Sequence, residues 1–164
     1  ADCLVLTRHN LERRNIDVQV DATATCRVEV NTSEVQQVLI NLIVNAIQAM
    51  PDGGNLRLRI RDWEEDGRTV GAAMEVCDTG QGIAAEDLSR IFDPFFTTKK
   101  GSGTGLGLSI SYTIVERYGG HISVASQPGQ GACFTVHLRS EARYADAPTA
   151  PGFTARWIET GPRS

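Results

Sequence analysis

The chain has 164 residues, of which 41% are hydrophobic and 22% are charged, so it is long enough to fold around one apolar core. Its net charge of −4 at pH 7 argues against a nucleic-acid-binding surface, which usually needs an excess of basic residues. No apolar run approaches the roughly 18 residues that a membrane span requires, and the opening residues carry no signal-peptide pattern.

The first thirty residues indicate a helix end followed by two strands. Residues 1–14 are expected to be the end of a helix, because their few leucines are too sparse to form a core by themselves. The segments 16–20 and 26–30 alternate apolar and polar residues, which predicts two strands.

Residues 34–50 are predicted to form a helix, because their apolar residues recur at helical spacing. Thr32 and Ser33 offer an N-cap, and Pro51 stops the run. Polar side chains fall three or four residues apart along the same helix: Glu34, Gln37, Asn41, Asn45 and Gln48. Such a line usually faces water. A buried amide, in contrast, needs a partner, since leaving it unpaired costs about 1–3 kcal/mol.

A strand pair follows the helix. Residues 56–61 alternate aliphatic residues with arginines, which we interpret as the solvent-facing side of a sheet whose other face is covered by helices. Residues 62–68 are typical of a hairpin loop, and the returning strand is predicted for 69–77. Its alternation directs Asp78 to the covered side, where a carboxylate needs donors such as the amino group of adenine.

Glycine-rich and aromatic segments come next. Residues 78–83 predict a sharp turn, and residues 85–91 a short helix. A cluster of aromatic residues at 92–96 borders a run rich in Gly, Ser and Lys, a composition that suits a lid hinged at one end, with Lys99 and Lys100 within reach of a polyphosphate. The helix predicted for 106–118 is preceded by Gly103 and Gly105, whose exposed backbone N–H groups suit a phosphate.

The segments 121–125 and 133–138 are predicted to close the domain as a hairpin, with His121 and His137 as exposed strand residues. Residues 140–164 change in composition and are left unassigned, either as a disordered tail or as a segment that packs on a neighbour. The four cysteines form no C-x-x-C pair, so we expect neither a zinc site nor a disulfide framework, and a reducing cytoplasm is the natural setting. These are Cys3, Cys26, Cys77 and Cys133.

The ordered set of motifs resembles a known family. The helix ending Asn41-Leu-Ile-Val-Asn45-Ala46 is similar to the N box of bacterial sensor histidine kinases, and residues 78–83, 92–96 and 101–108 resemble their G1, F and G2 boxes. Residues 119–124 and 128–134 are similar to the end of the same catalytic ATP-binding domain. Each motif is weak alone, but the ordered set is strong and covers residues 16–138.

The resemblance implies the Bergerat fold of the GHKL superfamily. This is a two-layer α/β (α+β) sandwich, in which helices cover one face of a mixed, mostly antiparallel sheet and a lid closes over ATP. It also implies three segments: the end of an upstream helix or linker at 1–14, the catalytic ATP-binding domain at 15–139 and the unassigned tail at 140–164.

By this resemblance the cofactors are ATP and Mg²⁺. Asn45 would coordinate Mg²⁺, Asp78 would accept a hydrogen bond from the adenine amino group, and Gly80, Gly82 and Ile83 would wall the base. The remaining nucleotide-binding candidates are Asn41, Phe95, Lys99, Gly103, Thr104, Gly105, Leu106, Gly107 and Leu108. Gln48 stands where many relatives have a cation, and Ala132-Cys133 replaces a frequent Thr pair, so we expect these departures to affect affinity.

The implied reaction is phosphoryl transfer from ATP-Mg to a histidine on a separate dimerisation domain of the same kinase, for relay to an aspartate in the receiver domain of a response regulator. In the ATP-hydrolysing branch of the superfamily a glutamate base stands where this chain has Asn41, and an amide cannot take a proton from water. His9 does not fit the phosphoacceptor pattern, so no residue here receives a certain catalytic role.

Two alternatives remain open, an ATP-hydrolysing clamp of the gyrase, Hsp90 or MutL type and a degenerate nucleotide-binding scaffold. We expect this fragment to act in the cytoplasm without nucleic-acid or membrane contact, and any membrane anchor of a parent protein to lie outside it.

Overall fold

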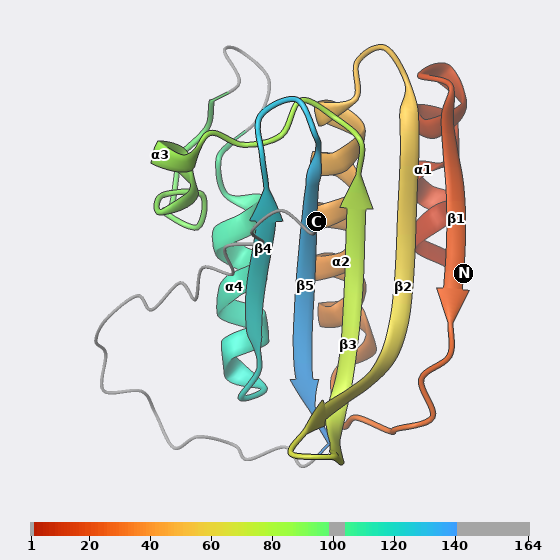
Figure 1. Cartoon of the computed structure of the whole chain (residues 1–164), viewed down its shortest axis with the longest axis vertical. Helices are drawn as coiled ribbons and strands as arrows, with labels where there is room; N and C mark the ends of the chain where they lie inside the picture. Colours follow the sequence, from red (N-terminus) through yellow and green to blue (C-terminus); the bar gives the residue numbers. More distant parts are fainter. Residues whose placement is uncertain (1, 99–103, 141–164) are drawn as a thin grey trace, which may run out of the picture.

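The computed structural model describes residues 2–98 and 104–140. Within them, five strands form one sheet in the order β1-β2-β3-β5-β4, and helices cover one of its faces (Figure 1). β1 runs parallel to β2 and the other pairs are antiparallel, so the predicted two-layer sandwich with a mixed sheet is confirmed. The strands are β1 (Ile16–Ala22), β2 (Gly54–Glu65), β3 (Arg68–Asp78), β4 (His121–Ser126) and β5 (Ala132–Arg139). The helices are α1 (Asp2–Arg13), α2 (Thr32–Ala49), α3 (Ala85–Leu88) and α4 (Gly107–Arg117).

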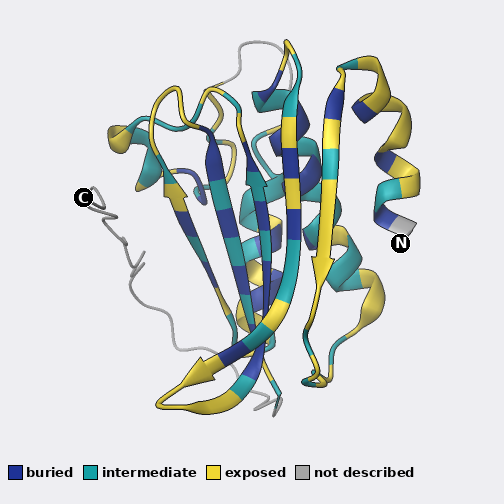
Figure 2. Cartoon of the chain, turned by 45° about the vertical axis from the view of Figure 1, so that its right-hand side comes forward, coloured by how far each residue is buried: buried dark blue, intermediate teal, exposed yellow. Residues whose placement is uncertain are grey.

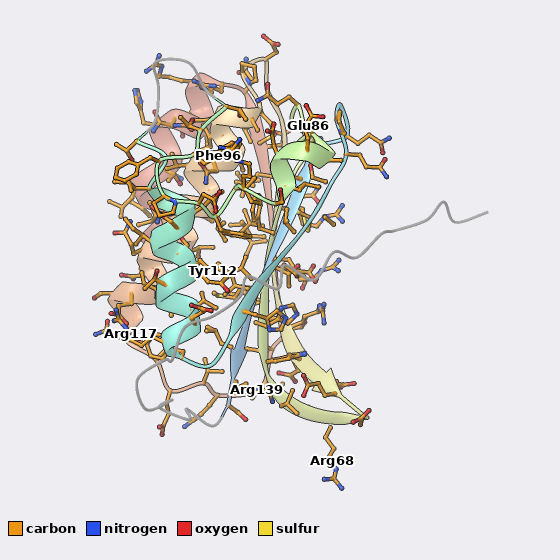
Figure 3. The ribbon with its side chains drawn as sticks, turned by 90° about the vertical axis from the view of Figure 1, so that its left-hand side faces the viewer. Arg68, Glu86, Phe96, Tyr112, Arg117 and Arg139 are labelled. Atoms are coloured by element: carbon orange, nitrogen blue, oxygen red, sulfur yellow. A yellow bond between two sulfur atoms is a disulfide. The ribbon has the colours of Figure 1, made fainter. Side chains whose placement is uncertain are left out.

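The core lies between the sheet and the helices, as the edge-on view in Figure 3 shows. Alternate residues of β2, β3, β5 and β4 point to the helices, and the buried stretches of these strands are dark in Figure 2. The helices supply apolar residues at three- and four-residue spacing. Buried members of this core include Leu56, Leu58, Val76, Phe134, Val136, Leu138, Val38, Leu42, Ile43, Ile47, Ile114 and Val115.

Helix α2 begins at Thr32, two residues earlier than predicted. Asn31 is the N-cap, and its side-chain oxygen accepts hydrogen bonds from the backbone N–H of Ser33 at 2.9 Å and of Glu34 at 3.3 Å. The prediction of Thr32 or Ser33 as the cap is therefore wrong, because Asn31 already satisfies these first-turn donors. The helix ends at Ala49, before Pro51, as predicted.

The predicted strand at 26–30 is not a strand. The backbone N–H groups of Thr25 and Cys26 each donate to Asp62 at 2.8 Å instead of to a neighbouring strand. These hydrogen bonds, of which the one from Cys26 has the largest effect, hold the pKa of Asp62 below its ordinary value. The alternating pattern has another cause, since Val28 and Val30 pack against the core from a segment that pairs with none of the described strands.

The hairpin between β2 and β3 is longer than predicted, because both strands run through the segment 62–68 up to a turn at Asp66 and Gly67. The extension places Trp63 on the open face of the sheet, where its ring contacts those of His121 and His137. Trp63 is buried there, and His137 is half-buried beneath it. The prediction of an exposed His137 is therefore wrong, whereas His121 is exposed as predicted.

Cys77 and Cys133 form a disulfide, which corrects the expectation of no disulfide. The two residues are far apart in sequence but face one another in the β3–β5 register. Sequence spacing alone does not reveal this pairing, since it depends on which strands become neighbours. Cys3 and Cys26 are free.

The remaining helices agree in place and differ in length. α3 ends at Leu88 and turns follow it, so the helix predicted for 85–91 is shorter. α1 contributes Cys3 and Leu11 to the core. None of the helices that the structure describes has both the length and the hydropathy needed to cross a membrane. The predicted lid residues Lys99, Lys100 and Gly103 and the tail beyond residue 140 lie outside the described residues.

Candidate functional site

A cavity of about 300 Å³ opens between α2, the loop that follows β3 and the segment that leads into α4. It is formed by parts of the chain that are far apart in sequence and that the fold brings to one end of the helical layer. Its lining consists of Asn41, Val44, Asn45, Gln48, Ala49, Asp78, Gln81, Gly82, Ile83, Ile91, Phe96, Thr97, Thr98, Thr104, Gly105, Gly107, Leu108, Ala132 and Phe134.

Helix α2 provides the amide-bearing wall. Asn41, Asn45 and Gln48 lie along one helical face, because residues three and four apart share a side of a helix. Asn45 is half-buried, and its side chain makes no hydrogen bond within the part of the chain that the structure describes. Its amide oxygen and nitrogen are therefore open to a ligand in the cavity.

Asp78 lies at the end of β3, on the side that faces the helices, with 9% of its surface exposed. Its Oδ1 accepts hydrogen bonds from the backbone N–H of Gly80 at 2.8 Å and of Ala132 at 3.3 Å. These two donors come from the next loop and from β5, so they fix the carboxylate between two elements. A carboxylate held in this way is a specific acceptor for a ligand N–H group.

The loop after Asp78 is held at both sides. On one side Gln81 donates from its backbone N–H to the carbonyl of Ala49 at 3.0 Å, at the end of α2. On the other, Ile83 donates to the hydroxyl of Ser126 at 2.9 Å. Gly82 has a φ of 70°, and a Cβ there would lie 2.0 Å from the carbonyl oxygen of Gln127. Glycine is therefore required at this close approach.

The start of α4 forms the opposite wall. Gly105 has a φ of 66°, and its carbonyl accepts a hydrogen bond from Phe95 N–H at 2.9 Å. Gly107 begins the helix, and Leu106 before it supplies no side-chain cap. The first N–H groups of α4 thus have no side-chain acceptor from the N-cap residue, and the positive end of the helix dipole lies beside the cavity.

Helices α2 and α4 are tied together by polar contacts. Asn41 Nδ2 donates to the carbonyl of Gly107 at 3.0 Å and to the hydroxyl of Ser111 at 3.1 Å. Farther along, Glu34 forms an ion pair with Arg117 and accepts a hydrogen bond from Tyr118. Arg117 lies at the end of α4 opposite to Phe96 in Figure 3.

The chemistry of the lining fits a purine nucleotide with a bound divalent cation. Asp78 offers an acceptor for an exocyclic amine, and the start of α4 offers donors for phosphate. A single amide oxygen, that of Asn45, suits Mg²⁺, which keeps several waters and phosphate oxygens as ligands. Within the described residues no cluster of three His, Cys, Asp or Glu residues could hold a metal by itself.

Most of the predicted site residues that the structure describes lie at this cavity. Phe95 does not line it and is 73% exposed. Gly80 packs against the backbone of Ala49 behind the lining, and Leu106 is half-buried outside it. The ligand roles of all these residues stay predictions.

Several lining residues were not predicted from the sequence. Val44 and Ala49 share the helical face of Asn41 and Asn45, so their spacing was a usable signal. Gln81, Phe96, Ala132 and Phe134 lie within the motifs at 78–83, 92–96 and 128–134, so the resemblance was a usable signal for them. Ile91, Thr97 and Thr98 carried no comparable signal, since their place depends on how loops pack.

The described geometry agrees with comparisons to known proteins. Residues 30–142 match the family described as "Histidine kinase-, DNA gyrase B-, and HSP90-like ATPase". The sensor histidine kinase ZraS of Escherichia coli K12 is 41% identical over 136 residues, which cover 82% of this chain and 28% of ZraS. The curated relatives are much longer, and the matches span between 14% and 30% of their lengths.

Solved structures show the same fold. The nucleotide-free catalytic domain of histidine kinase ThkA matches with a TM-score of 0.73 and 31% identity, covering 85% of this chain and 88% of that domain. Full-length ShkA in complex with AMPPNP matches with a TM-score of 0.72 and 26% identity, covering 86% of this chain and 29% of ShkA. ThkA in complex with the response regulator TrrA matches with a TM-score of 0.70 and 29% identity, covering 86% of this chain and 39% of that chain.

Proposed function

Because the chain belongs to the family of histidine kinase-, DNA gyrase B- and HSP90-like ATPases, we propose that it binds ATP-Mg and donates the γ-phosphoryl group to a histidine on another domain. The resemblance to sensor histidine kinase catalytic domains is confirmed by sequence and by fold. The chain matches only part of each relative, so the activity of the whole protein is part of this proposal.

One observation carries the proposal: Asn45 and Asp78 line a single cavity from different elements, with the start of α4 as its third wall. In that arrangement Asp78 accepts a hydrogen bond from the adenine amino group. Asn45 holds the metal through its amide oxygen, and the N–H groups at the start of α4 hold phosphate. The bound metal supplies charge neutralisation at the phosphates.

Transfer is favoured over hydrolysis by the residue at position 41. A water-activating base must carry a basic atom, and the amide of Asn41 has none. The acceptor is then a histidine on a dimerisation domain of the same kinase, and the next acceptor is the aspartate of a response regulator receiver domain. The complex of ThkA with its response regulator supports this second partner. We place the reaction in the cytoplasm, which supplies the ATP.

Calorimetric titration of the purified chain with ATP, ADP and GTP, with and without Mg²⁺, tests the binding step. We expect adenine nucleotides to bind and GTP to bind much more weakly. Absence of adenine nucleotide binding with Mg²⁺ present would overturn the proposal.

Incubation with γ-labelled ATP and separately supplied dimerisation helices tests the transfer step. We expect acid-labile label on the helices and little free phosphate. Steady phosphate release without the helices would indicate an ATP-hydrolysing clamp instead. Binding with neither product would indicate a scaffold.

A further inference from the structure

Three side chains form a polar relay between α2 and the first turn of α4. Asn41 Nδ2 donates to Gly107 and Ser111, and its Oδ1 accepts a hydrogen bond from Gln37 Nε2 at 3.0 Å. The Ser111 hydroxyl in turn donates to the Gly107 carbonyl at 2.8 Å. Ser111 is completely buried, with 0% of its surface exposed.

The orientation of the Asn41 amide follows from its partners. A backbone carbonyl such as that of Gly107 can only accept a hydrogen bond, so the Asn41 atom 3.0 Å away from it must be the nitrogen. An amide nitrogen has two N–H donors, and the Gly107 carbonyl and the Ser111 hydroxyl match that number. Asn41 thus lines the cavity while its donors are directed at α4.

We propose that Ser111 and Asn41 are positioning residues that hold the first turn of α4 in place for the phosphate groups of the nucleotide. The inference rests on the proposed function and adds a role for a buried hydroxyl that does not line the cavity. Gly107 is both the residue that the relay holds and a lining residue, so it connects the two. Asp78 lies on a different wall of the cavity, at the end of β3.

This placement predicts which part of the ligand responds. Removing the Ser111 hydroxyl leaves a partly buried N–H of Asn41 without its partner. The start of α4 then loses part of its attachment to α2, whereas the wall around Asp78 is unchanged. The affinity for phosphate-bearing ligands should fall, and that for adenosine should not.

The test compares three variants of the whole chain by titration with adenosine, ADP and ATP in the presence of Mg²⁺. Ser111→Ala should lower ATP affinity about fivefold, the loss expected for one hydrogen bond, and leave adenosine affinity within about twofold. Ser111→Cys keeps a similar volume with a weaker hydrogen-bonding group, so it carries the test if the alanine variant does not fold. Thr113→Ala is the matched control, because the exposed Thr113 hydroxyl bonds to the carbonyl four residues earlier in α4 but faces away from α2.

A double-mutant cycle with Asn41→Ala completes the test. In that background Ser111→Ala should cost less than about twofold further, since its partner is already absent. Equal losses for adenosine and ATP, an unchanged ATP affinity, or an equal effect of Thr113→Ala would each overturn the inference and leave the proposed function standing. A native chain that binds no adenine nucleotide would overturn both.

Discussion

Asp78 serves the fold and the site with the same side chain. Its Oδ1 accepts two backbone N–H groups, from Gly80 and Ala132, while the residue lines the cavity. An asparagine could keep these two hydrogen bonds through its amide oxygen, but it would replace the other carboxylate oxygen by a donor. The change therefore separates the structural role from the ligand-binding role.

We predict that Asp78→Asn leaves the fold intact and weakens ATP binding at least about tenfold, because a charge-assisted hydrogen bond of about 1.5–3 kcal/mol is lost. Calorimetry measures the affinity, and circular dichroism checks the fold. Glu64→Gln, an exposed change of the same chemistry on the β2–β3 hairpin, is the control. Unchanged ATP affinity would remove the role assigned to Asp78.

The Asn45 amide, which has no hydrogen-bond partner among the described residues, leads to a second prediction at the residue scale. Asn45→Ala should abolish the Mg²⁺-dependent part of ATP binding, because the metal loses its protein oxygen ligand. Titrations with ATP in Mg²⁺ and in EDTA should then coincide. Retention of the full Mg²⁺ effect would mean that the metal lies elsewhere.

His137, on the open face of the sheet, makes the stability of the fold depend on pH. Burial lowers the pKa of His137 from 6.5 to about 4, with smaller contributions from His121 and Arg61, which Glu75 partly opposes. Its Nδ1 is buried without a hydrogen-bond partner among the described residues. The folded state thus binds its proton more weakly than the unfolded chain does. This contribution to stability is full above pH 6.5 and is lost as the pH falls toward about 4.

We therefore predict that the free energy of unfolding falls between pH 6.5 and 4 with a slope below the ~1.4 kcal/mol per pH unit of one complete proton. Urea unfolding at several pH values measures the slope. His137→Gln should flatten it, whereas His9→Gln, on the exposed side of α1, should not. The same slope in the His137 variant would assign the effect to other groups.

At the scale of elements, the sequence predicted helices and strands best where the spacing of apolar residues was set by burial alone. The period of α2 and the alternation in β2, β3 and β5 report burial directly, so these elements were predicted well. The segment 26–30 has the same alternation without a strand, and the backbone N–H groups of Thr25 and Cys26 at its start donate to Asp62. Trp63 was assigned to a loop, because the acidic residues and the glycine that follow it are typical of a turn. The structure shows instead that β2 continues to Glu65.

The site was predictable for similar reasons. Asn41, Asn45 and Asp78 belong to motifs that are local in sequence, so their placement at one cavity could be expected from the resemblance. The contributions of Ile91, Thr97 and Thr98, which lie outside these motifs, arise from how the loops pack and could not. The register that brings Cys77 opposite Cys133 is likewise invisible until the strand order is known.

The disulfide between β3 and β5 predicts a response to reductant. Its reduction should lower the free energy of unfolding by about 2–4 kcal/mol, because the unfolded chain is no longer cross-linked. Urea unfolding with and without dithiothreitol measures the difference. A Cys77→Ser, Cys133→Ser double variant should not respond to reductant, and Cys26→Ser should. Four titratable thiols in the unreduced, unfolded chain would contradict the pairing.

At the scale of the whole molecule, the cavity is assembled from α2, the end of β3 and α4, so binding should stabilise the complete domain. ADP with Mg²⁺ at about 100 times its Kd should add ~2.7 kcal/mol and raise Tm by about 5–10 °C. Differential scanning calorimetry measures the shift. Asp78→Asn should reduce it, and an unchanged Tm for the native chain would argue that no ligand enters this cavity.

The hairpin between β2 and β3 has a practical value for such measurements. β3 runs from Arg68 to Asp78, so its turn lies about 30 Å from the cavity at ~3.3 Å per strand residue. A Cβ at Gly67 would meet no atom within 4 Å, although its φ of 73° favours glycine. A fluorophore or surface tether inserted at this tip would report on the chain or immobilise it while leaving the ligand entrance unobstructed.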